Sequence, residues 1–434
     1  FDAAASSKRS SLLQLNDDVL ALIVAQLHVY QQFELSQLHS RLRSIVQALW
    51  RTRVRSVELQ DEQLLGATSR QFQAFITALA PHLEQLSCQQ LDVRRLRLLR
   101  GQSLRGVTQL EWDQRQTRGR GRLRFVDDDV RLLQRLCPAL RRLTLRGCQV
   151  TGKYLCELRL LQELRLDDCQ CLESQHFRDI FRQLQLRKFD ILANCDEVNC
   201  CDLADVQLCP TLEHIRMADY HLCMESDITQ QLLQLPNLQQ LSIHSHNFVF
   251  DVLQRIARPT VGIVGKQIEG FRFNGLLHDY GRFLRELSNL RQLRRLELHG
   301  QPEEGQLQRL GDQMLQQLAA QLPELHELHI CGYQLESAAG LLQFVRSCRE
   351  LRLLDVTGSR CIGDGFVARC LALLAKLSWR CRPLELWIRH SDISASILQS
   401  PRYLISERFL RIDVSRISSN PERLSGVLQF SFVR

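Results

Sequence analysis

Several features that would place the chain in a specialised class are scarce or missing. Aromatic residues make up only 6% of the sequence, so few rings are available to stack on the bases of single-stranded nucleic acid. The most apolar stretch, from Phe366 to Trp379, is interrupted by Arg369 and Lys376 and is too short to span a bilayer. We therefore expect neither nucleic acid nor a membrane as the partner, although the net charge is +8.

Cysteine is abundant but lacks the patterns that usually explain it. The 16 cysteines are dispersed without a C-x-x-C pair, and no Asn-x-Ser/Thr glycosylation sequon occurs. Both facts favour a reducing compartment, in which a free cysteine acts as a small buried side chain. We expect a cytoplasmic or nuclear protein. Because the numbering begins at Phe1 rather than Met, we also expect the natural start to lie upstream.

Catalytic and metal-binding motifs are missing as well. The sequence has no phosphate loop, no Gly-x-Ser-x-Gly elbow and no dinucleotide fingerprint. One group of thiols has an imidazole nearby, but its spacing matches no zinc ribbon or finger, so we favour buried or loop thiols for Cys195, Cys200, Cys201 and Cys209, with His214 beside them. We expect no catalytic residue, no cofactor and no metal. His329, in an expected strand, should face solvent.

A repeat of the form L-x-x-L-x-L organises most of the chain. At 434 residues the chain exceeds the ~250–300 residues at which a single core stops growing. The motif begins at Leu140, Leu161, Leu186, Leu212, Leu238, Ile268, Leu293, Leu325 and Leu351, with looser copies at Leu83, Val107, Pro383, Phe409 and Val427. From Leu140 to Phe409 the mean period is about 27 residues, which is typical of an array with a helix in each unit.

Each repeat is expected to contain a strand and a helix. The last two apolar positions of the motif alternate with polar ones, which is the period of a short strand with one buried face. The rest of a unit has helical spacing, as in Phe177, Ile180, Phe181 and Leu184. No single unit encloses a core, so neighbouring units must stack. We predict an α/β array of parallel strands over residues 54–434.

These units resemble cysteine-containing leucine-rich repeats. The segment from Cys137 to Cys148, CPALRRLTLRGC, is close to the consensus of that class, and CPTLEHIRM from Cys209 repeats its first half. The resemblance implies a horseshoe solenoid with a parallel inner sheet and outer helices. Cys148 and Cys169 fall at the turn after the strand, where a small side chain packs against backbone.

The segment before the repeats follows a helical pattern instead. We expect residues 1–11 to be disordered and residues 12–53 to form a small helical module. Asn16 precedes Asp17 and Asp18, which gives an N-cap and a negatively charged first turn. So short a module forms a marginal core by itself, and some apolar surface should remain for a partner.

This module resembles an F-box. LNDDVLALIVAQL, from Leu15, stands where the family has its Leu-Pro-x-Glu-Ile-Leu opening, with Asn16 in place of the proline. ALWR, from Ala48, stands at the closing Leu-Trp, and Leu42 replaces a usual tryptophan. The resemblance implies that an adaptor binds the apolar residues Leu15, Val19, Leu20, Ile23, Leu27, Leu49 and Trp50.

An F-box followed by cysteine-containing repeats is the layout of the F-box/leucine-rich-repeat family. The resemblance implies a non-catalytic substrate receptor of a Skp–cullin–F-box ubiquitin ligase, which holds its target on the repeats while other subunits transfer ubiquitin. The alternative is a scaffold or inhibitor outside any ligase, in which the N-terminal helices only cover the apolar end of the repeats.

The inner face of the strands should carry the target site. Residues before, between and after the last two apolar positions point away from the core. They include the basic residues Arg142, Arg146, Arg165, Lys188, Arg216 and Arg272, followed by the acidic residues Glu297, Glu327, Asp355, Glu385 and Asp413. Arginines on adjacent strands can bind a carboxylate-rich or phosphorylated segment through bidentate hydrogen bonds. A mixed charged surface without a target is the alternative. A second basic candidate is the loop around Arg118, which we otherwise expect to be a solvated loop.

Overall fold

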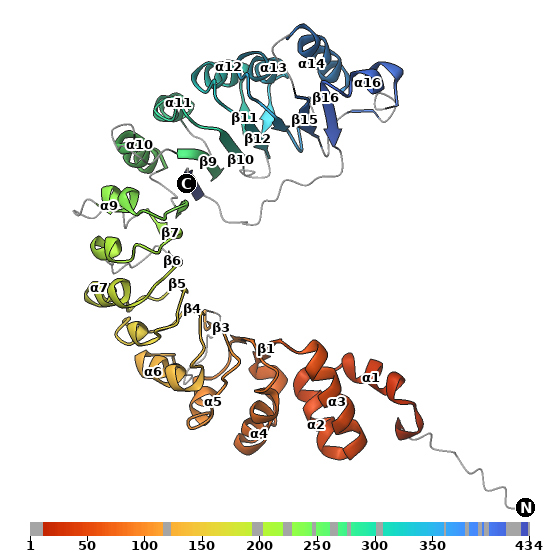
Figure 1. Ribbon diagram of the computed structural model, residues 1–434, viewed down its shortest axis with the longest axis vertical. Coiled ribbons are helices and arrows are strands. Elements are labelled where there is room, and N and C mark those ends of the chain that lie inside the picture. The colour runs from red at the N-terminus through yellow and green to blue at the C-terminus, as the bar shows by residue number, and fades with distance from the viewer. Residues whose placement is uncertain are drawn as a thin grey trace, which may run out of the picture. The chain divides into compact units, whose positions relative to one another are not determined.

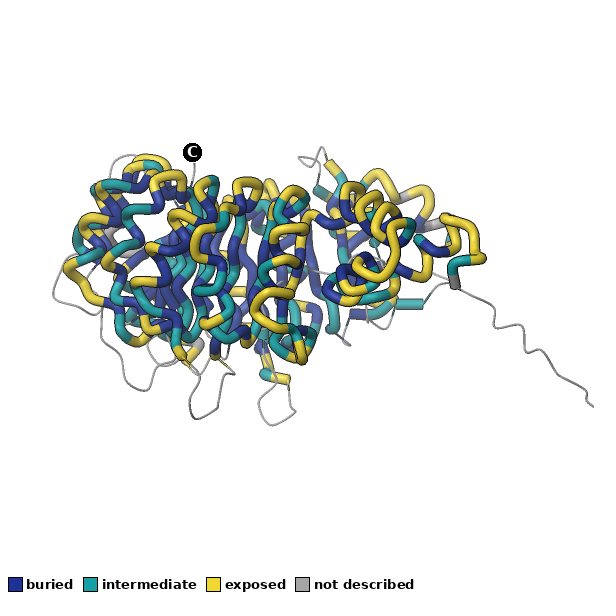
Figure 2. Tube along the Cα trace, turned by 90° about the horizontal axis from the view of Figure 1, so that it is seen from below, coloured by how far each residue is buried: buried dark blue, intermediate teal, exposed yellow. Residues whose placement is uncertain are grey.

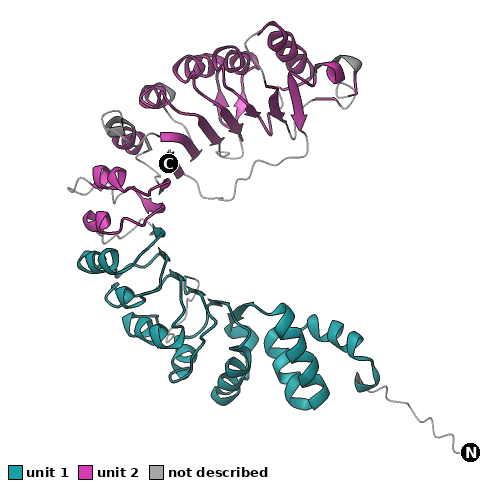
Figure 3. Ribbon diagram, in the orientation of Figure 1, with its two compact units in different colours: residues 1–201 teal, residues 202–434 magenta. Residues whose placement is uncertain are grey.

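The computed structural model describes residues 12–115, 123–192, 203–219, 228–244, 249–260, 268–275, 279–300, 307–359, 362–377, 382–388, 393–394, 399–413 and 427–432. The chain forms two compact units, residues 1–201 and residues 202–434 (Figure 3). In both units, short strands alternate along the chain with helices (Figure 1). None of the helices within these ranges is long and apolar enough to cross a membrane.

Unit 1 begins with a helical module that comprises α1 (Asp17–Ala25), α2 (Val29–Leu38) and α3 (Ser40–Arg53). The predicted N-cap is confirmed, because Asn16 Oδ1 accepts a hydrogen bond from the Val19 amide at 2.9 Å. His39 separates α2 from α3, and its Nδ1 accepts a hydrogen bond from the Arg41 amide at 3.1 Å. Leu20 of α1 packs against Leu42 of α3, so the first helix folds back on the third.

The repeats of unit 1 form a parallel sheet covered by helices. The strands follow one another in the order β1 (Ser56–Gln60), β2 (Gln85–Gln89), β3 (Gln109–Asp113), β4 (Arg142–Arg146), β5 (Glu163–Asp167) and β6 (Lys188–Leu192). The connections contain η2 (Asp61–Leu64), α4 (Ser69–Leu79), α5 (Val93–Leu98), α6 (Asp127–Leu136), η3 (Leu155–Glu157) and α7 (Ser174–Gln183). Leu143 lies opposite Leu164, and Leu164 lies opposite Phe189, so the repeat leucines form a continuous buried row.

Unit 2 repeats this arrangement. Its parallel strands are β7 (His214–Ala218), β8 (Gln240–His244), β9 (Ile268–Gly275), β10 (Arg295–Gly300), β12 (Glu327–Cys331), β14 (Leu353–Asp355), β15 (Leu384–Trp387) and β16 (Leu410–Asp413). The connections contain η4 (Ala204–Leu208), α9 (Ile228–Gln234), α10 (Val249–Thr260), α11 (Tyr280–Leu287), α12 (Asp312–Gln321), α13 (Ala339–Ser347), α14 (Asp364–Lys376) and α16 (Pro401–Ser406), and β11 (Arg309–Leu310) pairs with β13 (Gln334–Leu335). Figure 2 shows buried residues along the strands and exposed residues on the outer turns of the helices. The α/β class and the parallel strands match a leucine-rich-repeat array.

The last strand departs from the prediction. The motif at Val427 was expected to add a further parallel strand, but β17 (Val427–Phe432) instead runs antiparallel between β8 and β9. Strand β17 accordingly lies beside β9, near the mark for the C-terminus in Figure 1. The alternating pattern of β17 is the same as in the repeats, so its buried face is as expected and only its neighbours and direction differ.

The cysteines of the repeat turns are buried against backbone, as predicted. Cys148 Sγ lies 3.5 Å from the Arg146 carbonyl oxygen, and Cys169 Sγ lies 3.6 Å from the Leu145 carbonyl oxygen. Burial raises the pKa of the Cys148 thiol well above its ordinary value. These thiols are small packing groups that donate weak hydrogen bonds.

Candidate protein-interaction surfaces

Helix α1 exposes an apolar stripe. Leu15, Val19, Leu22 and Ile23 are 37%, 39%, 61% and 39% exposed, respectively. Within α1, the spacing of Val19 to Leu22 and Ile23 by three and four residues places these three on one side of the helix, and Leu15 lies just before its N-cap. Leu22 was not among the predicted contact residues, although its position three residues after Val19 could have identified it. We call these four residues the α1 stripe.

The structure corrects two of the predicted adaptor contacts. Leu20 is fully buried and packs on Leu42 and Ile45, and Trp50 is 2% exposed. Trp50 Nε1 also donates a hydrogen bond to Gln32 Oε1 at 2.7 Å. Both side chains hold the helices together, so neither is available to a partner. The remaining predicted contacts, Leu27 and Leu49, are half-buried.

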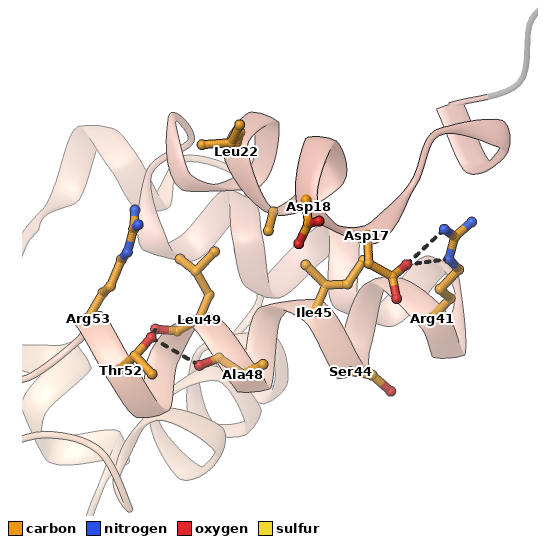
Figure 4. A pocket seen from close by; sticks show the side chains of 11 residues that line it. Asp17, Asp18, Leu22, Arg41, Ser44, Ile45, Ala48, Leu49, Thr52 and Arg53 are labelled. Carbon is orange, nitrogen blue, oxygen red and sulfur yellow. Dashed lines mark hydrogen bonds and ion pairs between the residues drawn. The ribbon is translucent and has the colours of Figure 1, made fainter.

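A groove of about 830 Å³ lies beside the stripe, between α1 and α3. Its apolar lining includes Leu22 from α1 and Ile45 and Leu49 from α3, as Figure 4 shows. At one end Arg41 Nη2 lies 2.7 Å from Asp17 Oδ1, and Arg53 lines the groove as well. The module therefore presents an apolar groove with charged residues around it, next to an exposed apolar helix side.

The other face of the module covers the first repeat. The rings of Tyr30, Phe33 and Trp50 surround Phe75 of α4, with centroid distances of 5.3, 5.5 and 6.4 Å. Phe75 is fully buried. Helices α2 and α3 thus close the apolar end of the repeats in unit 1, while α1 remains on the outside.

The predicted basic residues of unit 1 lie on the inner face, but most are paired with acids. Arg146 Nη1 lies 2.6 Å from Glu111 Oε1, and its guanidinium is also 3.6 Å from Asp113 and 3.7 Å from Asp167. Two further pairs, Arg165 with Asp167 and Lys188 with Glu163, are 3.6 Å long. Arg142 is exposed, and no ion pair is found for it within the described part of the chain. The surface is a mixed charged network rather than a basic stripe.

Arg115, the first arginine of the basic run that leads into the loop around Arg118, belongs to this network. Its Nη2 lies 2.7 Å from Asp113 Oδ2. Burial would raise the pKa of Asp113, but the hydrogen bonds from Arg115 and the charges of Arg115 and Arg146 outweigh it and hold that pKa below its ordinary value. Asp113 is consequently ionised across the physiological range and fixes both guanidinium groups in place.

In unit 2 the inner face carries a row of alternating charge. Arg272, Glu297, His329, Asp355 and Trp387 lie in register on β9, β10, β12, β14 and β15. Arg272 Nε donates to Glu297 Oε2 at 2.5 Å, and His329 Nδ1 lies 3.1 Å from Asp355 Oδ2. The ring of Trp387 meets the ring of His329 edge-on at 5.8 Å. We call these five residues the β9–β15 row. Arg216, on β7, is half-buried at the corresponding inner-face position of its own strand.

Charge pairing sets the protonation of this row. Burial would raise the pKa of Glu297, but hydrogen bonds from His299 and Arg272 and the charge of Arg295 outweigh it and hold that pKa far below the ordinary range. Burial would lower the pKa of His329, but Asp355 and Glu327 outweigh it and raise that pKa. His329 was expected to face solvent; it does point to the inner face, but it is only 4% exposed because its neighbours cover it.

Two other candidate sites from the sequence, the thiol group near His214 and the loop around Arg118, lie partly or wholly outside the described residues. Cys195, Cys200 and Cys201 lie outside them, while Cys209 Sγ contacts Thr211 Oγ1 at 3.5 Å and His214 Nδ1 contacts Gln240 Oε1 at 2.9 Å. No group of metal-ligand side chains occurs in the ranges that the structure covers. Arg118 of the basic loop also lies outside the described residues.

Comparisons with known proteins assign no family. No family model matches the chain, and no curated protein matches it. Among solved structures 103 chains match, one of them from the crystal structure of a TLR13–ssRNA13 complex. It is 14% identical with a TM-score of 0.38, and the match covers 85% of this chain. This chain spans 59% of the length of that one, and at this TM-score the likeness supports no conclusion about function.

Proposed function

We propose that the chain is the substrate-recognition subunit of a Skp–cullin–F-box ubiquitin ligase in the cytoplasm or nucleus. The α1 stripe and the adjacent groove would bind the Skp-type adaptor, which links the chain to the cullin. The inner strand face would hold the target protein. Catalysis would belong to other subunits.

The α1 stripe is the observation that carries this proposal. Solvent-exposed apolar side chains that lie together on one helix side mark a surface that a partner covers. The stripe belongs to the module whose sequence resembles an F-box, and Leu49, part of the resemblance, lines the groove next to it. The exposed apolar stripe and the resemblance to an F-box both favour a Skp-type adaptor as the partner.

Co-purification with a Skp-type adaptor tests the proposal. We compare the intact chain with a Val19→Asp/Ile23→Asp variant, in which two exposed positions become charged. Leu38→Asp is the matched control, because Leu38 is also in the module and is 75% exposed, but lies on α2. Leu20→Asp would be unsuitable, since a buried charge unfolds the module.

We expect the intact chain and Leu38→Asp to retain the adaptor and the double variant to lose at least about tenfold in affinity, or about 1.4 kcal/mol. All three should have the same thermal unfolding midpoint. Equal adaptor binding by all three proteins, or none by the intact folded chain, would contradict the ligase assignment.

A non-ligase scaffold or inhibitor is the second candidate. The packing of Tyr30, Phe33 and Trp50 around Phe75 favours a capping role for the same helices. Removing residues 12–51 would uncover Phe75 and so disturb the repeats, whereas point variants on α1 leave the cap intact. The α1 variants therefore distinguish the two functions, and a truncated chain does not.

A further inference from the structure

The C-terminal strand β17 occupies an unusual place in unit 2. Consecutive repeats elsewhere in this unit pair directly, as β7 does with β8 and β9 with β10. Between β8 and β9, which are also consecutive repeats, β17 is inserted and pairs antiparallel with both.

The inserted strand completes the core at this point. Leu428 and Phe430 are fully buried and Phe432 is 4% exposed. The ring of Phe430 lies 5.2 Å from that of Phe271 on β9. Gln429 and Ser431 alternate with these residues and lie half-buried on the inner face.

The two flanking strands are already aligned with each other. Phe430 lies opposite both Leu241 of β8 and Phe271 of β9, and Ser431 lies opposite both Gln240 and Gly270. In directly paired repeats the same motif positions face one another, as Phe271 faces Leu296. Equivalent motif positions of β8 and β9 are therefore already level with each other, as in directly paired repeats, although β17 lies between the two strands.

We propose that β17 is a reversible insert, and that β8 and β9 pair directly in parallel when it leaves. No shift along either strand is needed. The amide and carbonyl groups of β8 and β9 that were bonded to β17 can then hydrogen-bond to each other. The inserted state is the major one, because it buries Leu428, Phe430 and Phe432.

The exchange changes the inner face of unit 2. In the inserted state Gln429 lies between Ser242 and Arg272. In the closed state Ser242 and Arg272 become neighbours, and the row of strands is shorter by one spacing of about 4.8 Å. A protein that binds this face better in one state shifts the population toward that state. The proposal goes beyond the ligase assignment and does not depend on it.

Paired cysteines in the full chain report the two states. Gly270→Cys/Ser431→Cys is the inserted-state pair: a Cβ on Gly270 would lie 3.3 Å from Ser431 Cβ, close to the spacing of a disulfide. Gln240→Cys/Gly270→Cys is the closed-state pair. With β17 inserted, these two positions are two strand spacings apart, roughly 9–10 Å, beyond the reach of a disulfide. The Gly270→Cys single variant is the control for native thiols.

We expect the inserted-state pair to form an intrachain bridge quickly under mild oxidation, read out by mass spectrometry of bridged peptides. The closed-state pair should also bridge fully, at least about tenfold more slowly, because the closed state is a minor population. A closed-state pair that stays reduced while the inserted-state pair bridges would make β17 a permanent strand and overturn the proposal. An inserted-state pair that fails to bridge, or bridges only between two chains, would overturn it as well.

Discussion

His329 on β12 and Asp355 on β14 form a hydrogen-bonded pair, with 3.1 Å between Nδ1 and Oδ2. Asp355 is fully buried and also accepts a hydrogen bond from the Thr357 hydroxyl at 2.7 Å. His329 Nε2 lies 3.8 Å from Glu327, too far for a hydrogen bond, so Glu327 acts on it through its charge. A protonated His329 therefore stabilises unit 2.

This pair predicts a pH-dependent stability. The pKa of His329 is raised above 6.5, so its contribution is complete below that value and is lost as the pH rises through the raised pKa. The pKa of Asp355 is lowered, so its contribution is lost only in acid. We expect the melting temperature of the intact chain to fall as the pH rises above about 6.5, and the His329→Gln variant to show a flatter curve.

The matched control for this titration is His326→Gln. Burial and the charge of Arg352 lower the pKa of His326, so its substitution cannot remove a loss of stability at rising pH. Parallel melting curves for the intact chain and the His329→Gln variant would show that this histidine is not the titrating group.

Leu164→Asp should destabilise the repeats of unit 1 by about 4 kcal/mol or more. Leu164 is 1% exposed in the buried leucine row, and an unpaired buried charge is costly. Gln162→Ala, two residues earlier and half-buried, should change stability by no more than about 0.5 kcal/mol. Denaturant unfolding measures both, and equal midpoints would show that the assumed strand phase is wrong.

Gly332→Ala should be more destabilising than Gly358→Ala. Both glycines have a left-handed backbone, with φ of 75° and 85°, so an alanine is strained at either position. A Cβ on Gly332 would also collide with the Gly300 carbonyl oxygen, whereas nothing lies within 4 Å of a Cβ on Gly358. We expect an extra loss of about 1–3 kcal/mol for Gly332→Ala in thermal unfolding. Similar losses would show that the turn at Gly332 relaxes.

Arg165→Glu combined with Arg216→Glu should weaken capture of the target by at least about tenfold without changing adaptor binding. Arg165 is a better probe than Arg146, because among the described residues its ion pair is with Asp167, whereas Arg146 lies close to Glu111, Asp113 and Asp167. The wild-type interaction should also weaken with salt. Arg135→Glu, on the outer helix α6, is the control. The readout is the set of proteins that co-purify with the intact chain. If the amount of captured target changes neither with the charge reversals nor with salt, the target site lies elsewhere.

The local elements of this protein could be predicted from its sequence. Alternation of apolar and polar residues specified the buried side of each strand, and Leu143 and Leu164 lie where that pattern puts them. Asn16 and the acids after it specified the start of α1. Such features depend on interactions within a few residues, which sequence spacing expresses directly.

The contacts of the interaction surfaces were decided by tertiary packing. Helix α1 is apolar on most sides, so its sequence could not tell whether Leu20 or Leu22 faces inward. Contact with Leu42 and Ile45 decided this. Similarly, the alternation placed Arg272 and Glu297 on the inner face, but strand register brought their side chains into contact.

The strand β17 shows the same division most clearly. Its pattern of alternating apolar residues is that of every repeat, which determines a strand with one buried face. The pattern contains no information about the neighbours of the strand or its direction, because both depend on residues far away in the sequence. Only the fit of Phe430 between Leu241 and Phe271 in the folded unit placed it antiparallel between β8 and β9.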